Sequence, residues 1–293
     1  QDLRCDLYDK LSRVFGFARR GREQGFQVEH SPAFVYVHCG EKKPTIGHTL
    51  TERKGVQSTM PMNKVVHAAQ RAAFSAAIDS AIKAVRGKGP ENMAEQAVKL
   101  VNLAQPLRAH RYPDADWDKV RAFVSDPNSK WMGYAYKAIN EIDPHILKMN
   151  ALNLVYEGMF AGYNYVMELR KQYDCNMPWI LLFDPTSACN LHCKGCWAAE
   201  YGNRLNLSFE DMDRIVTEGE ELGIHWYMCT GGEPTCRKED LFKLAAKHQS
   251  SVFHLFTNGT LIDQAFCDRV KEVGNMAFFI SIEGIGDATD DRR

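Results

Sequence analysis

Apolar runs and helix-like periods alternate along residues 179–293. Four short apolar runs have the length and the β-branched and aromatic content of strands. Helical periods lie between them at 208–222 and 262–273, and the first opens with the capping-box sequence Ser-Phe-Glu-Asp at Ser208. Strands that alternate with helices predict parallel strands joined by right-handed crossovers, which is an α/β fold. The strands are predicted at 179–183, 224–229, 252–256 and 276–282.

The preceding part of the chain, residues 60–177, has the period of helices. A basic amphipathic helix is predicted at 62–86, ended by the sequence Gly-Lys-Gly-Pro. Such a helix can lie on an anionic membrane surface, but we favour packing against neighbouring helices because the segment is only modestly apolar. Further helices follow, and the charged residues in the last one, 151–173, exclude a membrane span. Prolines at 106, 113, 127 and 144 are expected to separate these helices.

Residues 1–59 lack a clear period. Two interpretations stay open: a short strand or loop region, or sequence upstream of a true start at Met60 or Met62, which we favour. The predicted organisation therefore has three parts. Residues 1–59 are an uncertain or non-native extension, 60–177 a helical region, and 178–293 the α/β part.

Composition narrows the class of protein. With 293 residues, 45% of them hydrophobic, and a formal net charge of −1, the chain can bury a core and has no general attraction for nucleic acid. It opens without the pattern of a secretory signal. Its nine cysteines are therefore expected to be reduced thiols or metal ligands. These features predict a cytoplasmic protein without a nucleic-acid partner.

The candidate chemistry begins with three cysteines directly after the first predicted strand. Cys189, Cys193 and Cys196 have a C-x3-C-x2-C spacing. Thiolates are the ligands that iron–sulfur clusters require, and three of them on one short loop would leave one iron of a cubane cluster open. Half of a zinc site and a chance spacing are the alternatives.

A second motif follows the second predicted strand, where Gly231, Gly232, Glu233 and Pro234 stand in a row. Two glycines permit close backbone approach and unusual dihedral angles, and the carboxylate can receive a cationic amino group. Cys229 and Cys236 bracket this segment. They could approach the site, but we favour packing at the strand end for both.

Together these motifs resemble the radical S-adenosylmethionine (radical SAM) superfamily. The resemblance implies a partial (β/α) TIM-like barrel preceded by the helical region. It also implies a [4Fe–4S] cluster on Cys189, Cys193 and Cys196, whose fourth iron is chelated by S-adenosyl-L-methionine. Gly231, Gly232 and Glu233 would hold the methionyl amino end of that cofactor.

The resemblance extends less specifically to two further positions, Asn258 after the third strand and Ser281 at the fourth, which would line the cofactor pocket. A simple turn is the alternative for Asn258. The cysteine loop departs from the family pattern at one position. The residue before the last cysteine is often aromatic in the family and is Gly195 here, so that an adenine contact would fall to Trp197.

The activity implied by the resemblance is radical chemistry. An external one-electron reductant, flavodoxin-like or ferredoxin-like, would lead to cleavage of S-adenosylmethionine, and a 5′-deoxyadenosyl radical would abstract hydrogen from an unknown substrate. The family core has six strand–helix units and four strands are readable, so we expect a fragment of a longer enzyme. A non-catalytic iron–sulfur or zinc protein, or a partner subunit whose barrel is completed in trans, are the alternative functions.

Overall fold

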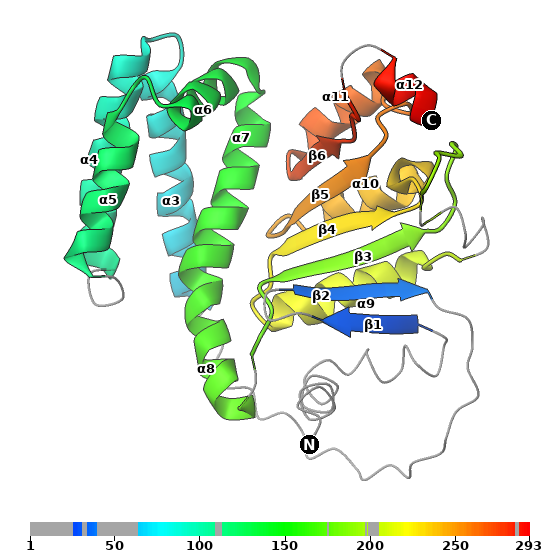
Figure 1. The fold of residues 1–293 in the computed structure, drawn as a ribbon. Helices are drawn as coiled ribbons and strands as arrows, with labels where there is room; N and C mark the ends of the chain where they lie inside the picture. Colours follow the sequence, from blue (N-terminus) through cyan, green and yellow to red (C-terminus); the bar gives the residue numbers. More distant parts are fainter. Residues whose placement is uncertain are drawn as a thin grey trace. The chain divides into compact units, whose positions relative to one another are not determined.

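The computed structural model describes residues 26–30, 34–39, 64–108, 113–174, 176–196, 198, 205–284 and 287–293. The chain divides into two compact units. One combines residues up to His67 with Met149–Arg293, and the other is Ala68–Lys148. Figure 1 shows the elements of both, and each unit is described by itself.

The larger unit is built on a six-stranded sheet in the order β1-β2-β3-β4-β5-β6. β1 is antiparallel to β2, whereas β2 to β6 run parallel, which confirms the α/β fold with parallel strands. The four predicted strands are present with their ends shifted by a few residues. The strands are β1 (Phe26–His30), β2 (Phe34–Cys39), β3 (Ile180–Thr186), β4 (Trp226–Gly231), β5 (Val252–Thr257) and β6 (Met276–Ile280).

Two further strands come from residues 1–59, where the sequence left a short strand or loop region open as one interpretation. β2 pairs with β3 in parallel, from Phe34 opposite Ile180 to Val37 opposite Phe183. Of the two interpretations left open for residues 1–59, the described residues therefore contain short strands. β3 gains a neighbour on its free edge, and a short distant segment can supply one without showing a strong period of its own.

Helices cover one face of this sheet (Figure 1). They are α9 (Phe209–Glu221), α10 (Lys238–Lys247) and α11 (Gln264–Val273), with the short α12 (Ala288–Arg292) after β6. As the capping box predicted, Ser208 caps α9: its hydroxyl accepts from the Asp211 backbone N–H at 3.0 Å and donates to the Asp211 carboxylate at 2.8 Å. Alternate residues on the covered face form a buried row across three strands: Leu181 and Phe183, Tyr227 and Cys229, Phe253 and Leu255.

A long helix crosses the amino ends of the strands (Figure 1). It runs from α7 (Pro144–Ala151) through η1 (Leu152–Gly162), which has π-helical hydrogen bonding, into α8 (Tyr163–Tyr173). The buried Asn153 donates to the carbonyls of Gln249 and Ser251, both at 3.0 Å. The helical prediction for 151–173 is correct, but it missed the π-helical turns. π-Helical turns leave few periodic traces, and they often occur where a side chain is needed elsewhere.

The smaller unit is helical. It contains α4 (Pro90–Arg108), α5 (Asp114–Ser125), α6 (Lys130–Glu141) and most of α3 (Lys64–Val85), around a core of Val85, Met93, Ala94 and Met132. Gly87 ends α3 as predicted, with a φ of 76°. Pro106 was expected to separate helices but lies inside α4, near its end, where few hydrogen bonds remain to be broken. None of the described helices is long and apolar enough to cross a membrane.

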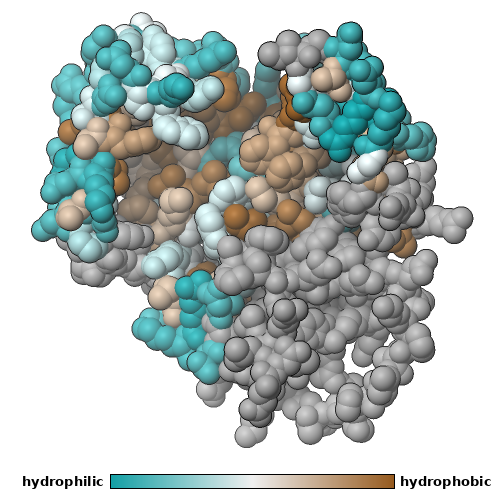
Figure 2. All heavy atoms as spheres, in the orientation of Figure 1, coloured by the Kyte–Doolittle hydropathy of each residue, from teal (hydrophilic) through white to brown (hydrophobic). Residues whose placement is uncertain are grey.

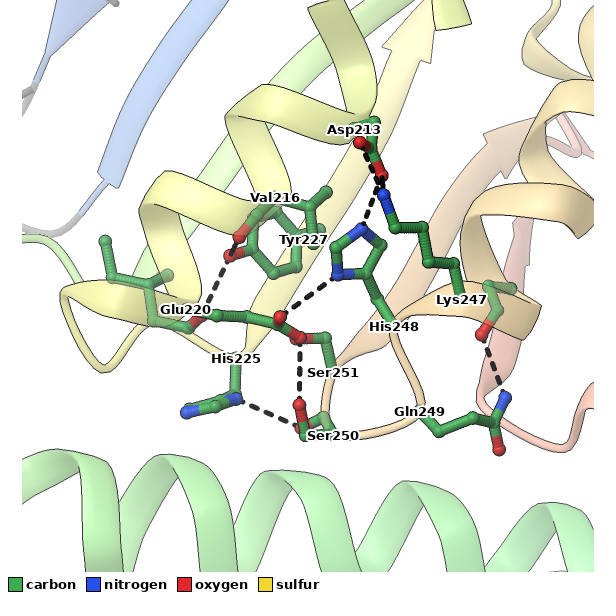
Figure 3. Close-up of polar contacts among 12 residues, drawn as sticks. Asp213, Val216, Glu220, His225, Tyr227, Lys247, His248, Gln249, Ser250 and Ser251 are labelled. Carbon is green, nitrogen blue, oxygen red and sulfur yellow. Dashed lines mark hydrogen bonds and ion pairs between the residues drawn. The ribbon is translucent and has the colours of Figure 1, made fainter. Parts of the chain in front are cut away.

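A charged network stands at the amino end of β5, away from the motifs (Figure 3). The buried ring of His248 contacts Glu220 through Nδ1 and Asp213 through Nε2, each at 3.0 Å. The hydroxyls of Ser250 and Ser251 donate to Glu220 at 2.9 and 2.6 Å. Burial opposes the charged forms, but the hydrogen bonds and opposite charges outweigh it. They raise the pKa of His248 and lower the pKa values of Glu220 and Asp213.

This network makes stability depend on pH. The raised pKa of His248 means that its contribution is complete below the ordinary histidine pKa of about 6.5 and is lost as the pH rises through the folded value. The two carboxylates contribute above about pH 4.5 and lose their contribution as the pH falls through their lowered values. The network therefore stabilises the fold most between about pH 4.5 and 6.5.

We predict that His248→Gln lowers the free energy of unfolding by about 1–3 kcal/mol at pH 6 and by less at pH 9, because only the charged imidazolium makes both strong bonds. Urea unfolding at the two pH values measures this. His145→Gln, at an exposed position, is the control. An equal loss at both pH values would contradict the prediction.

Candidate functional site

The motifs singled out in the sequence come together at the carboxyl edge of the sheet. The cysteine loop follows β3, the Gly-Gly-Glu-Pro segment follows β4, Asn258 follows β5, and Ser281 follows β6. In sheets of this type the loops at this edge carry the chemistry. The topology therefore gathers residues that lie up to 92 positions apart in the sequence, Cys189 to Ser281.

The three thiols of the cysteine loop are all partly exposed. Cys189 Sγ accepts a hydrogen bond from the Leu191 backbone N–H at 3.4 Å, and the Cys196 N–H donates to the Cys193 carbonyl at 3.2 Å. Between them Gly195 has a φ of 71°, and no described residue lies within 4 Å of the position of a Cβ. Burial raises the pKa of Cys189, and the neighbouring Glu233 and the other two thiols add to the effect.

This donor set fits an iron–sulfur cluster. A cubane cluster distributes its thiolates over separate irons, so the sulfurs need to face one space without converging on one point. Within the described residues, no three His, Cys, Asp or Glu side chains converge closely enough to hold a single metal ion.

The two glycines allow the turn after β4 to lie against the start of the cysteine loop. Gly231 has a φ of 105°, which favours glycine, and a Cβ on Gly232 would overlap the carbonyl oxygens of Ser187 and Ala188. The Gly232 N–H donates to the Thr186 carbonyl at 3.0 Å, and the Glu233 N–H donates to the Ala188 carbonyl at 2.8 Å. The close backbone approach expected from the sequence is thus made to the chain that leads into Cys189.

The carboxylate of Glu233 is buried, with 1% of the residue exposed, and it is held by internal donors. Oε1 accepts from the Thr235 N–H at 3.0 Å, the Thr235 hydroxyl at 2.6 Å and the Thr257 hydroxyl at 2.7 Å. Oε2 accepts from the Asn258 N–H at 2.8 Å. Glu233 therefore joins the loops that follow β4 and β5, a role that the sequence motif did not reveal.

Asn258 lies beside the cysteine loop. Its Nδ2 donates to Asn190 Oδ1 at 3.0 Å and lies 4.0 Å from Cys189 Sγ, and Asn190 Nδ2 donates in turn to Thr260 Oγ1 at 2.8 Å. Ser281 is more remote from the cysteines. It is exposed, and its backbone N–H donates to the Thr257 carbonyl at 2.9 Å.

Two expectations about other residues of the site have different outcomes. Cys229 is fully buried in the strand row, as expected. Cys236 is instead exposed, on the 3-10 turn η3 (Pro234–Arg237), and the expectation that it packs at the strand end was wrong. The turn begins at Pro234, immediately after Glu233, and leaves Cys236 exposed. Trp197 lies outside the described residues.

Aromatic rings form a row on the sheet face opposite the buried core. Trp179, Trp226, His254 and Phe279 follow one another at centroid distances of 5.1, 5.4 and 5.6 Å, and Phe279 stacks on Phe256 at 4.9 Å. Figure 2 shows apolar side chains gathering over β5 and β6, where Phe256 and Phe279 are exposed. The row ends one residue from Thr257, so an apolar wall borders the site.

Comparison with known proteins assigns this part of the chain to a family. Residues 183–293 match the model of the Radical SAM superfamily. Over 117 residues the chain is 34% identical to the Fe-coproporphyrin III synthase of Methanosarcina barkeri, a match that covers 38% of this chain and 29% of that protein. It is also 34% identical over 107 residues to the GTP 3′,8-cyclase of Geobacter sulfurreducens, which covers 34% of this chain and 32% of that protein.

Among solved structures, Streptococcus suis SuiB bound to S-adenosylmethionine matches with a TM-score of 0.35 and 18% identity, over 68% of this chain and 45% of that chain. The matches to the two curated relatives span less than a third of each of those proteins. Residues 183–293 belong to the radical SAM superfamily. Its members carry out SAM-dependent radical chemistry with a [4Fe–4S] cluster and S-adenosyl-L-methionine as cofactors.

We predict that Gly232→Ala destabilises the larger unit by about 2–4 kcal/mol, because the new methyl group would displace the backbone that leads into Cys189. Gly158→Ala is the matched control, since a Cβ there meets only the Asn153 carbonyl at an ordinary 3.6 Å. Chemical unfolding of both variants measures the difference. A Gly232→Ala protein as stable as Gly158→Ala would contradict the close approach.

We also predict that Glu233→Gln costs about 2–3 kcal/mol of unfolding free energy, because an amide must turn its NH2 group toward either the Asn258 N–H or the threonine donors. Glu239→Gln is the control. Its carboxylate is mostly exposed and pairs only with Arg269 among the contacts described, so a change below about 0.5 kcal/mol is expected. Urea unfolding at pH 7 compares the two, and similar losses would argue against the buried junction.

Proposed function

We propose that the chain contains the catalytic part of a radical SAM enzyme that abstracts hydrogen from its substrate. The cofactors of the superfamily would supply, when bound, a 5′-deoxyadenosyl radical as the hydrogen abstractor. The observation that carries the proposal is the joining of the cysteine loop to the Gly-Gly-Glu turn by two main-chain hydrogen bonds, from Gly232 to Thr186 and from Glu233 to Ala188. This contact brings the two motifs of the family into one site.

Each residue of the site has a proposed role. Cys189, Cys193 and Cys196 hold the cluster through their thiolates. Gly231 and Gly232 present backbone at the methionyl end of S-adenosylmethionine, and Glu233 fixes this turn relative to Asn258 through its buried carboxylate. Asn258, with its amide beside Cys189, and Ser281, at the same edge, border the nucleoside part of the cofactor.

The chain's own contribution to the chemistry is positioning and exclusion of water. Main-chain bonds and a buried carboxylate define the site, and both hold their geometry better than exposed side chains. The exposed Phe256 and Phe279 offer an apolar wall to a substrate that the reactive centre must shield from stray hydrogen donors. An external one-electron reductant of the flavodoxin or ferredoxin type is the proposed electron donor.

The substrate stays unassigned. One relative is named for the synthesis of Fe-coproporphyrin III and another for the cyclisation of GTP, and these products differ in size, charge and polarity. The family model that residues 183–293 match names no substrate either. Nothing in the described site favours one of these substrate classes.

We predict that anaerobic reconstitution with iron and sulfide gives a [4Fe–4S] electron paramagnetic resonance signal in the reduced protein, and that S-adenosylmethionine shifts this signal. Cys193→Ala should lose the signal because only two loop thiolates remain. Cys267→Ala, a partly buried cysteine on α11, should retain it.

The other outcomes distinguish the alternatives. A cluster that does not respond to the cofactor, or zinc in its place, would favour a non-catalytic metal protein. A chain that fails to fold until a second protein is added would favour a partner subunit. Either result would overturn the proposal of a radical SAM enzyme in this chain.

A further inference from the structure

Two exposed phenylalanines lie beside the candidate site, on the sheet face opposite the buried core. Phe256 on β5 pairs in register with Phe279 on β6, so both side chains point to the same face. Their rings stack at a centroid distance of 4.9 Å and an interplanar angle of 24°, and 37% of Phe256 and 44% of Phe279 is exposed. Asn258 and Ser281 each follow one of them by two positions. The aromatic pair therefore borders the loops of the candidate site.

The pair rests on a histidine whose ring is fixed in place. His254 meets Phe279 edge to face at a centroid distance of 5.6 Å. Its Nδ1 accepts from Trp226 Nε1 at 3.1 Å, which leaves the ring proton on Nε2, and Nε2 donates to Asn150 Oδ1 at 3.3 Å. Because both nitrogens are bonded, the ring cannot turn without losing a hydrogen bond. The aromatic surface is thus formed before any ligand arrives.

The strands around the pair carry little charge. Asp184 on β3 is the one Asp, Glu, Lys or Arg residue in β3, β4, β5 and β6, and β4 lies between it and Phe256. Burial lowers the pKa of His254 to about 4, so its imidazole is neutral at pH 7. An ionic group placed on this surface would lose its water without gaining a partner. The surface therefore suits an uncharged group.

The geometry of the pair favours a flat ring over a saturated chain. Aromatic rings attract one another at centroid distances of about 4.5–7 Å, and this attraction adds about two- to tenfold in affinity to the effect of buried area. The rings of the row already contact one another at 4.9 to 5.6 Å, and the two phenylalanines remain partly exposed. A further ring can therefore continue the row, whereas a saturated chain would gain only from burial.

We propose that Phe256 and Phe279 bind a flat, uncharged ring of the substrate and hold it next to the loops that carry the cofactors. This inference rests on the proposed function and names the part of the substrate that the site selects. A substrate ring is the occupant, rather than a second protein, because the pair is continuous with the candidate site: Phe256 lies two residues from Asn258, whose amide is 4.0 Å from Cys189 Sγ.

Two matched probes test the proposal. N-acetyl-phenylalaninamide carries a flat ring, and N-acetyl-cyclohexylalaninamide carries the same six carbons in a puckered ring with more apolar surface. Their dissociation constants for the full chain are measured by ligand-observed NMR titration, before and after anaerobic reconstitution with iron, sulfide and S-adenosylmethionine. The phenyl probe should bind at least about twofold more tightly in both states. Burial alone would favour the cyclohexyl probe, so tighter binding of that probe, equal binding, or no binding of either would overturn the proposal.

Leucine variants locate the binding surface. Phe256→Leu and Phe279→Leu keep an apolar side chain but remove the ring, so each should weaken the phenyl probe about two- to tenfold and change the cyclohexyl probe by less than about twofold. Phe123→Leu, at a half-exposed phenylalanine on α5 of the smaller unit, is the matched control and should change neither. Urea unfolding checks that all three variants fold. A Phe279→Leu chain that keeps the preference for the phenyl probe would also overturn the proposal.

The two proposals fail in different ways. If the cluster forms and responds to S-adenosylmethionine while the probes bind without the expected preference, only the substrate class is wrong. If the phenyl preference is present but the unmodified chain takes up no cluster that responds to the cofactor, the proposed function is wrong, and the ring that the pair binds is not the substrate of a radical enzyme.

Discussion

The buried carboxylate of Glu233 is the interaction on which the arrangement of the site depends. A carboxyl group with almost no exposure loses its hydration, and its burial costs free energy unless protein donors replace the water. Here the donors come from Thr235 on η3, from Thr257 at the end of β5 and from Asn258 directly after it. The need to satisfy this one group therefore fixes the distance between the ends of β4 and β5. Through Asn258 and Asn190 the constraint extends to the cysteine loop.

The two edges of the sheet differ in character: the amino edge carries a hydrogen-bonded network, and the carboxyl edge carries the candidate site. At the amino edge, His248 and Asn153 satisfy charged groups and backbone carbonyls close to the start of β5. At the carboxyl edge the cysteine loop stays partly exposed and Gly195 borders open space. The rigid network at one edge allows the other edge to keep the open, adaptable geometry that a cofactor needs.

The sequence was sufficient for the parts of this protein that depend on local patterns. Ser208 and Gly87 marked helix ends because capping is a short-range interaction, and the apolar runs located four strands. The cysteine spacing and the two glycines located the loops of the candidate site for the same reason. What the sequence could not show depends on contacts between distant segments. β2 is a strand because β3 is beside it, and Thr257 is a partner of Glu233 only after the fold brings them together. Cys236 was misjudged because the conformation of a single 3-10 turn decides its exposure.

Gly195 stands where the radical SAM superfamily often has an aromatic residue, and its backbone conformation gives a physical reason for the difference. Its φ of 71° lies in the left-handed region, where a side chain costs about 1 kcal/mol or more, and the following N–H of Cys196 turns back to the Cys193 carbonyl at 3.2 Å. An aromatic residue at this position would have to bear that strain or open the turn. Glycine relieves the strain and keeps the last two thiols on a tight loop, but it removes a ring that could stack on adenine. One residue therefore cannot easily provide both the tight loop and an aromatic ring for stacking. The glycine in this chain favours the tight loop. No described residue lies within 4 Å of the position that a Cβ on Gly195 would take, so under the proposed function other elements of the site would have to hold the nucleoside end of the cofactor.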